Sequence, residues 1–338
     1  MKALIVTDLH LRPAYIEKAR LILEIIEQKI DELKPEYLIN LGDTFHSKNT
    51  TYVSVTNLYE NFLRRVAKKV KVINLVGNHD WATQYTDHSL DSFKDIENVT
   101  IVDDVFVLGE NAFIAYCREK DRFKAMLDKA GPRIVRIFAH MDMDDFTPGS
   151  GWEEISPFFK AEDFTRYEQV ISGHLHLAQE KKLENGTEII FAGSGYTTDF
   201  GESDQEKRFL LFDLRTGQYE SIPLNTTFHK TLHMKTTEPF PKIDLEEVKR
   251  GVEYRVIITG TKEEYASLIF PKNYPAKPIP NFTSAKGARI ELSASDTQED
   301  TMKKYVKTEI ERTYGGLEKS GFDIDKLVKF GKRFIPND

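Results

Sequence analysis

The chain has 338 residues, of which 40% are hydrophobic and 30% charged, and it contains one cysteine. The formal net charge of −7 excludes binding to nucleic acid through bulk positive charge alone, so such a partner would need local basic residues or bound cations. The single Cys117 excludes an internal disulfide framework, and no apolar run has the length of a membrane span. We therefore expect a two-domain globular protein of a reducing compartment such as the cytoplasm.

The first hundred residues alternate between strand-like and helix-like segments. Apolar runs at 3–6, 37–41 and 71–76 predict short buried strands, and the first follows Met1 so closely that we expect no signal peptide. Between these runs, apolar residues recur at helical spacing over 16–33 and 55–66. This order of strands and helices predicts a parallel sheet with crossover helices.

Beyond residue 95 the segments become shorter and the helices fewer. A helix is expected near 120–130 and a long polar loop over 142–166, whereas the other segments are typical of strands separated by turns. The change toward antiparallel hairpins predicts a second sheet stacked on the first. The strands of this part of the chain are expected at 99–102, 106–108, 112–115, 134–138, 169–172, 179–184, 188–191, 208–213 and 219–223.

The organisation changes again near residue 229. Strands are expected at 232–236 and 254–259, and the capping-box pair Thr261 and Glu264 predicts a short helix. A proline-rich crossing then leads to a last strand at 289–292. The predicted fold is α/β: two stacked mixed β-sheets flanked by helices over 1–228, a small α+β cap domain over 229–295, and a C-terminal helical pair over 296–338.

Side chains that bind metals follow predicted strands in five separate places. Because the carboxyl ends of neighbouring strands meet at one edge of a sheet, side chains far apart in the sequence can converge there. Four imidazoles, two carboxylates and an amide are too many for one tetrahedral zinc site, and they suit two adjacent divalent ions. Mixed nitrogen and oxygen donors favour Mn, Fe, Zn or Co over Ca or Mg. The residues are Asp8, His10, Asp43, Asn78, His140, His174 and His176.

The order Asp-x-His, Gly-Asp, Gly-Asn-His-Asp, His and Gly-His-x-His resembles the calcineurin-like metallophosphoesterases. The resemblance implies that Asp8, His10 and His176 hold one metal ion. It implies that Asn78, His140 and His174 hold the other, with Asp43 as the bridge. We expect two divalent ions, Mn²⁺ first and Mg²⁺ as a substitute. For the histidines outside these motifs, an ordinary core or surface role is preferred: His88, His229 and His233.

The segment Gly42-Asp43-Thr44-Phe45-His46 narrows the resemblance to the SbcD-type DNA repair nucleases. Phage relatives of that group are recombination endonuclease subunits, and an aromatic-His segment leading into a small cap is also similar. The resemblance implies a manganese-dependent nuclease, with exonuclease action on duplex ends and endonuclease action on single strands. For a phage-encoded chain the compartment would be the host cytoplasm.

Three residues beside the expected metals are candidates for catalysis. His79 is not required as a ligand, and it is placed to stabilise charge on the phosphorane or to protonate the leaving oxygen. Asp80 would accept a hydrogen bond from the ring of His79 and fix its tautomer, or else cap a helix. His46 either helps to position DNA, as the resemblance implies, or is a solvent-facing loop residue. Arg12 and Lys48 follow two of the metal motifs and are the candidate DNA contacts.

Two apolar faces raise the question of partners. The face formed by Val55, Leu58, Phe62 and Val66 can pack on its own sheet, whereas the resemblance implies a twofold homodimer. The tail over 296–338 can dock on the cap, whereas the resemblance implies binding to the coiled coil of an SbcC-type ATPase. Two other functions stay open: a general phosphodiesterase or phosphatase acting on small or protein substrates, and a dimeric scaffold without catalysis.

Overall fold

The computed structural model of the chain describes residues 1–147, 158–203, 205–283, 303–307, 310 and 324. The described chain divides into two compact units. The first comprises Met1–Met234, Glu238–Ile257 and Phe270–Ile279. The second comprises Lys235–Thr237, Ile258–Ile269 and the part that starts at Pro280. Within the described residues, no helix is long and apolar enough to cross a membrane.

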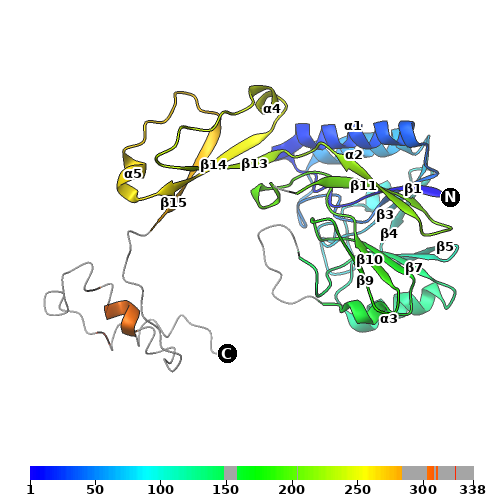
Figure 1. Cartoon of the computed structure of the whole chain (residues 1–338). Coiled ribbons are helices and arrows are strands. Elements are labelled where there is room, and N and C mark those ends of the chain that lie inside the picture. The colour runs from blue at the N-terminus through cyan, green and yellow to red at the C-terminus, as the bar shows by residue number, and fades with distance from the viewer. Residues whose placement is uncertain (148–157, 204, 284–302, 308–309, 311–323, 325–338) are drawn as a thin grey trace. The chain divides into compact units, whose positions relative to one another are not determined.

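The first unit contains a six-stranded sheet that includes the first four strands of the chain (Figure 1). Its order is β12 (Tyr219–Leu224), β11 (Lys207–Asp213), β1 (Lys2–Val6), β2 (Tyr37–Asn40), β3 (Lys71–Leu75) and β4 (Val99–Val102). β1 to β4 pair in parallel, and β11 and β12 are antiparallel additions at one side. The crossovers are α1 (Ile16–Leu33) and α2 (Val53–Val66).

A second six-stranded sheet is stacked on the first. Its order is β5 (Val105–Leu108), β6 (Asn111–Ile114), β7 (Arg136–His140), β8 (Gln169–Gly173), β10 (Glu188–Phe191) and β9 (Gln179–Lys182). The four central strands are parallel, and both outer strands are antiparallel to their neighbours. The helix α3 (Lys120–Ala130) connects β6 to β7.

The alternation of apolar residues along β1 explains the layers. Ala3 and Ile5 lie in a buried cluster with Phe113 and Phe138 of the second sheet. Leu4, one residue out of phase, lies in another cluster with residues of α1 and α2. α1 and α2 cover the outer face of the first sheet, and α3 covers the outer face of the second (Figure 1). The prediction of two stacked mixed sheets flanked by helices is confirmed.

The region after residue 229 contains a three-stranded sheet. Its order is β13 (His229–Lys235), β14 (Glu253–Gly260) and β15 (Ala276–Phe282). The sequence analysis assigned the proline-rich stretch to a crossing, and this assignment is wrong because Pro278 and Pro280 lie within β15. A proline offers no N–H to a neighbour, so it is tolerated on an edge strand such as this one.

Two short helices accompany this sheet. α4 (Leu245–Lys249), which the sequence analysis did not predict, begins where Asp244 accepts hydrogen bonds from two backbone N–H groups. α5 (Lys262–Ala266) begins with the predicted capping box of Thr261 and Glu264. The strand expected at 289–292 and nearly all of the tail helices fall outside the described residues. The bounds of the three predicted domains stay a prediction.

Candidate metal centre

The structure brings all seven candidate ligands together at the edge where five strands end. Asp8 and His10 follow β1, Asp43 follows β2, and Asn78 follows β3. His140 is the last residue of β7, because that strand runs two residues later than predicted. His174 and His176 follow β8. The two sheets therefore each contribute part of one site.

One group of ligand atoms consists of Asp8, His10 and His176. The Nε2 atoms of His10 and His176 lie 3.0 Å apart. Oδ1 of Asp8 lies 3.8 Å from the first of these atoms and 3.7 Å from the second. This oxygen is buried and has no hydrogen-bond partner. Because a buried carboxylate oxygen is costly without a partner, the group fits a divalent cation.

The second group consists of Asp43, Asn78, His140 and His174. Oδ1 of Asn78 lies 2.9 Å from Nε2 of His140 and 2.8 Å from Nδ1 of His174. Nδ1 of His140 donates to the backbone carbonyl of Leu41 at 2.8 Å. This bond fixes the tautomer and leaves Nε2 available as a ligand atom.

Asp43 lies between the two groups. Its Oδ1 is 3.3 Å from Nε2 of His140, and its Oδ2 is 3.6 Å from Nε2 of His10. Burial alone would raise the pKa of Asp43, but the neighbouring His140 and His10 hold that pKa well below its usual value. Asp43 in turn outweighs the effect of burial on His140 and raises the pKa of that ring to about 9. Asp43 thus favours positive charge on His140, whereas burial holds the pKa of His10 well below its usual value.

Four of the candidate ligands have left-handed backbone. The φ angles are 53° at Asp8, 41° at His10, 53° at Asp43 and 80° at His174. Residues with a Cβ avoid this region, and each such position costs of order 1–3 kcal/mol. Strain of this kind gathers at sites where side-chain direction matters more than stability.

Glycines before two of the ligands let the loops pack closely. A Cβ on Gly77 would lie 2.2 Å from Oδ1 of Asp43. A Cβ on Gly173 would lie 2.1 Å from Oγ1 of Thr7 and 3.0 Å from Nδ1 of His140. These separations are shorter than van der Waals contact. The loops can therefore converge only because glycine, which has no side chain, occupies both positions.

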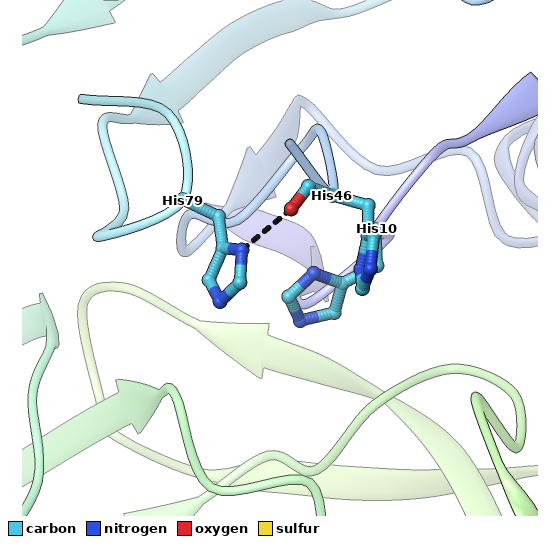
Figure 2. Close-up of side chains that lie close together, drawn as sticks. All are labelled: His10, His46 and His79. Carbon is cyan, nitrogen blue, oxygen red and sulfur yellow. Dashed lines mark hydrogen bonds between the residues drawn. The ribbon is translucent and has the colours of Figure 1, made fainter. Parts of the chain in front are cut away.

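His79 stands beside the first group of ligands, as Figure 2 shows. The centroid of its ring is 4.8 Å from that of His10. Its Nδ1 donates to the backbone carbonyl of His46 at 2.6 Å, which leaves Nε2 as the ring atom able to act on a substrate (Figure 2). Nη1 of Arg12 lies 3.3 Å from Nε2 of His46. Partial burial, together with Arg12 and His79, lowers the pKa of His46 to about 4.

Two roles were expected for Asp80: to accept a hydrogen bond from the ring of His79, or to cap a helix. The first is not formed, because Nδ1 of that ring donates to the carbonyl of His46. The carboxylate of Asp80 accepts from the backbone N–H groups of Gly77, Thr44 and Phe45 at 3.0, 3.2 and 3.1 Å. Asp80 therefore joins the loop after β2 to the loop after β3.

The two candidate DNA contacts differ in their surroundings. Nη2 of Arg12 donates to the backbone carbonyl of Thr198 at 3.0 Å, so its guanidinium is fixed beside His46. Lys48 is exposed. Contact of either residue with DNA stays a prediction.

The sequence analysis missed Glu202. This residue is fully buried, and its Oε1 lies 2.6 Å from Nδ1 of His176. It lies in the loop after β10, 26 residues beyond His176. An acidic residue in a polar loop carries no local signal of such a contact.

Comparisons with known proteins agree with this geometry. The family model described as calcineurin-like phosphoesterase matches residues 1–178, a segment that contains all seven candidate ligands. "Putative phosphoesterase 244L" of Invertebrate iridescent virus 6 is 25% identical over 297 residues, which cover 80% of this chain and 98% of that protein. "DNA double-strand break repair protein Mre11" of Methanocaldococcus jannaschii is 23% identical over 261 residues, covering 70% of this chain and 69% of that protein.

A further relative is similar over a shorter segment. "Exonuclease subunit 1" of Enterobacteria phage T4 is 33% identical over 99 residues, which cover 29% of this chain and 26% of that protein. The family match, by contrast, spans more than half of the chain. The chain belongs to the calcineurin-like phosphoesterases, a family whose members bind two divalent metal ions and hydrolyse phosphoesters.

Proposed function

We propose that the chain is a manganese-dependent DNA nuclease, an exonuclease on duplex ends and an endonuclease on single strands. The observation that carries phosphodiester hydrolysis is Asp43, whose two oxygens face two separate groups of ligand atoms. DNA as the substrate is supported by the names of two relatives, an exonuclease subunit and a DNA double-strand break repair protein.

The ligand atoms fit two divalent ions. Asp8, His10 and His176 would hold one ion. His140 and His174, with Asn78, would hold the other, and Asp43 would contact both. When bound, such ions lower the pKa of a water molecule and offset the negative charge of a phosphodiester. That offset matters for a chain with a net charge of −7.

The chain itself supplies a proton donor and its orientation. The carbonyl of His46 holds Nδ1–H of His79, so Nε2 is the atom that carries the exchangeable proton. In its protonated form, this ring stabilises negative charge on the phosphate and protonates the leaving oxygen. Arg12 lies beside His46 and adds a fixed positive charge near the site, which favours binding of a phosphate group there.

Two substrates separate DNA cleavage from general phosphodiesterase activity. The purified full chain with Mn²⁺ is incubated with end-labelled duplex and single-stranded DNA, and in parallel with bis-p-nitrophenyl phosphate. The proposal expects hydrolysis of all three and shortening of the duplex from its ends. Hydrolysis of the small ester alone would contradict the DNA assignment and favour a general phosphodiesterase.

We also propose a homodimer and an SbcC-type ATPase partner, bound through the tail over 296–338. The dimer surface needs residues other than the predicted face of α2, because Val55, Phe62 and Val66 are buried in the core of the chain itself. Exposed apolar residues at the start of α2, Tyr52 and Val53, are available for such a contact.

A further inference from the structure

The buried carboxylate of Glu202 lies between the candidate metal ligand His176 and the buried Lys207. Its Oε1 accepts the Nδ1–H of His176 at 2.6 Å. The other ring nitrogen, Nε2, points toward Asp8 and His10 in the first group of ligand atoms. One nitrogen of the ring is therefore occupied by a carboxylate, while the other faces the site.

The carboxylate of Glu202 is fixed by several donors. Its Oε2 accepts from Nζ of Lys207 at 2.7 Å, from the backbone N–H of Thr198 at 3.1 Å and from Oγ of Ser194 at 3.3 Å. Glu202 is fully buried and Lys207 is 2% exposed. A buried carboxylate needs such partners to stay ionised. Lys207 thus keeps the carboxylate of Glu202 ionised beside Nδ1 of His176.

His140 and His176, two of the candidate ligands, differ in the group that accepts from Nδ1–H. Nδ1 of His140 donates to a neutral carbonyl, that of Leu41, whereas Nδ1 of His176 donates to a carboxylate. A charged acceptor makes the stronger hydrogen bond and increases the electron density on the opposite nitrogen. Nε2 of His176 is therefore a stronger metal ligand than Nε2 of His140.

We propose that Glu202 is a positioning residue of the metal centre: through Nδ1–H it fixes the tautomer of His176, so that Nε2 is the metal-binding atom. Lys207 holds the carboxylate in place. The inference rests on the proposed dimetal centre and is independent of whether DNA is the substrate. The alternative is that Glu202 and Lys207 only close the loop after β10.

Metal binding to the full chain separates these two roles. Metal-free wild type, Glu202→Gln and the control Glu168→Gln are titrated with Mn²⁺ by calorimetry. The substitution Glu202→Gln preserves the shape of the side chain and removes its charge. Glu168 is a matched control because it also pairs with a buried cation, Arg136, at the opposite end of β8.

The proposal expects one of the two Mn²⁺ sites to weaken by about 10- to 100-fold in Glu202→Gln, with the other site unchanged. Glu168→Gln should bind both ions as the wild type does. Unchanged affinity at both sites of Glu202→Gln, with a lower melting temperature of the metal-free protein, would establish the merely structural role. A wild type that binds no Mn²⁺ would instead overturn the dimetal centre itself.

A second measurement needs no variant. In the wild type loaded with Zn²⁺, the long-range ¹H–¹⁵N spectrum of the histidine rings reports which nitrogen of His176 carries hydrogen. The proposal expects hydrogen on Nδ1. Hydrogen on Nε2 would overturn it, whether or not Glu202→Gln folds.

Discussion

At the scale of single residues, the site depends on how each imidazole is held. The ring nitrogens of His79 and His140 donate to backbone carbonyls, those of His46 and Leu41, whereas His176 donates to a carboxylate. Each bond selects one tautomer and therefore one nitrogen that faces the reaction. The chemistry of these rings is thus set by atoms outside the ligand motifs.

The variant His79→Ala should keep its metal and lose hydrolysis. The ring of His79 forms a group with His10 and His46 that contains no carboxylate. Its proposed role is proton donation, which contributes about 10²-fold or more. Metal analysis and the rate of bis-p-nitrophenyl phosphate hydrolysis measure the two properties. His233→Ala, which removes an exposed imidazole, is the control. Full activity in His79→Ala would exclude His79 from the mechanism.

Asp43→Asn should behave differently from His79→Ala. The carboxylate of Asp43 faces both groups of ligands, so its loss should reduce bound metal as well as activity. Elemental analysis after dialysis measures the metal content. Asp31→Asn, at an exposed residue that pairs with Lys69, should retain both ions. Retention of both ions in Asp43→Asn would contradict the bridging role.

At the scale of elements, the strand ends around the site pack closely against one another. Asp80 accepts from backbone N–H groups of the loops after β2 and β3, and Gly77 lies against Asp43 of the loop after β2. Gly173, at the end of β8, lies against Thr7 and His140. The packing of these loops therefore fixes the positions of the ligand side chains.

A side chain at Gly173 should disturb this packing. Because a Cβ there would lie 2.1 Å from Oγ1 of Thr7, we expect Gly173→Ala to lower the free energy of unfolding by about 1–3 kcal/mol. Urea denaturation of the metal-free protein measures the change. The double variant Thr7→Ala/Gly173→Ala removes the opposing atom, so its loss should be smaller than the sum of the two single losses. Additive losses would show that the close contact is not the cause.

The elements that the sequence predicted are those with strong local signals. Helical spacing located α1 and α3, and apolar runs located the strands of both sheets to within about two residues. β15 was missed because prolines suggest a break, whereas an edge strand needs fewer N–H donors. α4 was missed because five residues are too few for a periodic pattern.

At the scale of the whole molecule, the metal motifs were predictable because strand ends of an α/β fold share one edge. Glu202 and the carbonyl of His46 were not predictable in the same way. The first reaches His176 only through the fold of a distant loop, and the second is a main-chain atom that every residue possesses. The spacing of residues along the chain therefore does not predict the hydrogen-bond acceptors that fix the tautomers of these rings.

Removal of residues 296–338 tests the proposed ATPase partner. The shortened chain should lose binding to an SbcC-type ATPase and keep hydrolysis of bis-p-nitrophenyl phosphate, because every candidate ligand lies before residue 177. Pull-down with the ATPase and the hydrolysis rate measure the two properties. A shortened chain that fails to fold would favour docking of the tail on the cap.

The division of the ligands between β1, β2 and β3 on one side and β7 and β8 on the other has a consequence during synthesis. A nascent chain that has left the ribosome only as far as β4 contains four of the candidate ligands, Asp8, His10, Asp43 and Asn78, and lacks the three histidines His140, His174 and His176. The full set of candidate ligands is present only after β8 and the loop that follows it have been synthesised. Lys207 is synthesised later still. A fragment truncated before β8 would lack a histidine of each ligand group, so it should not hydrolyse phosphoesters.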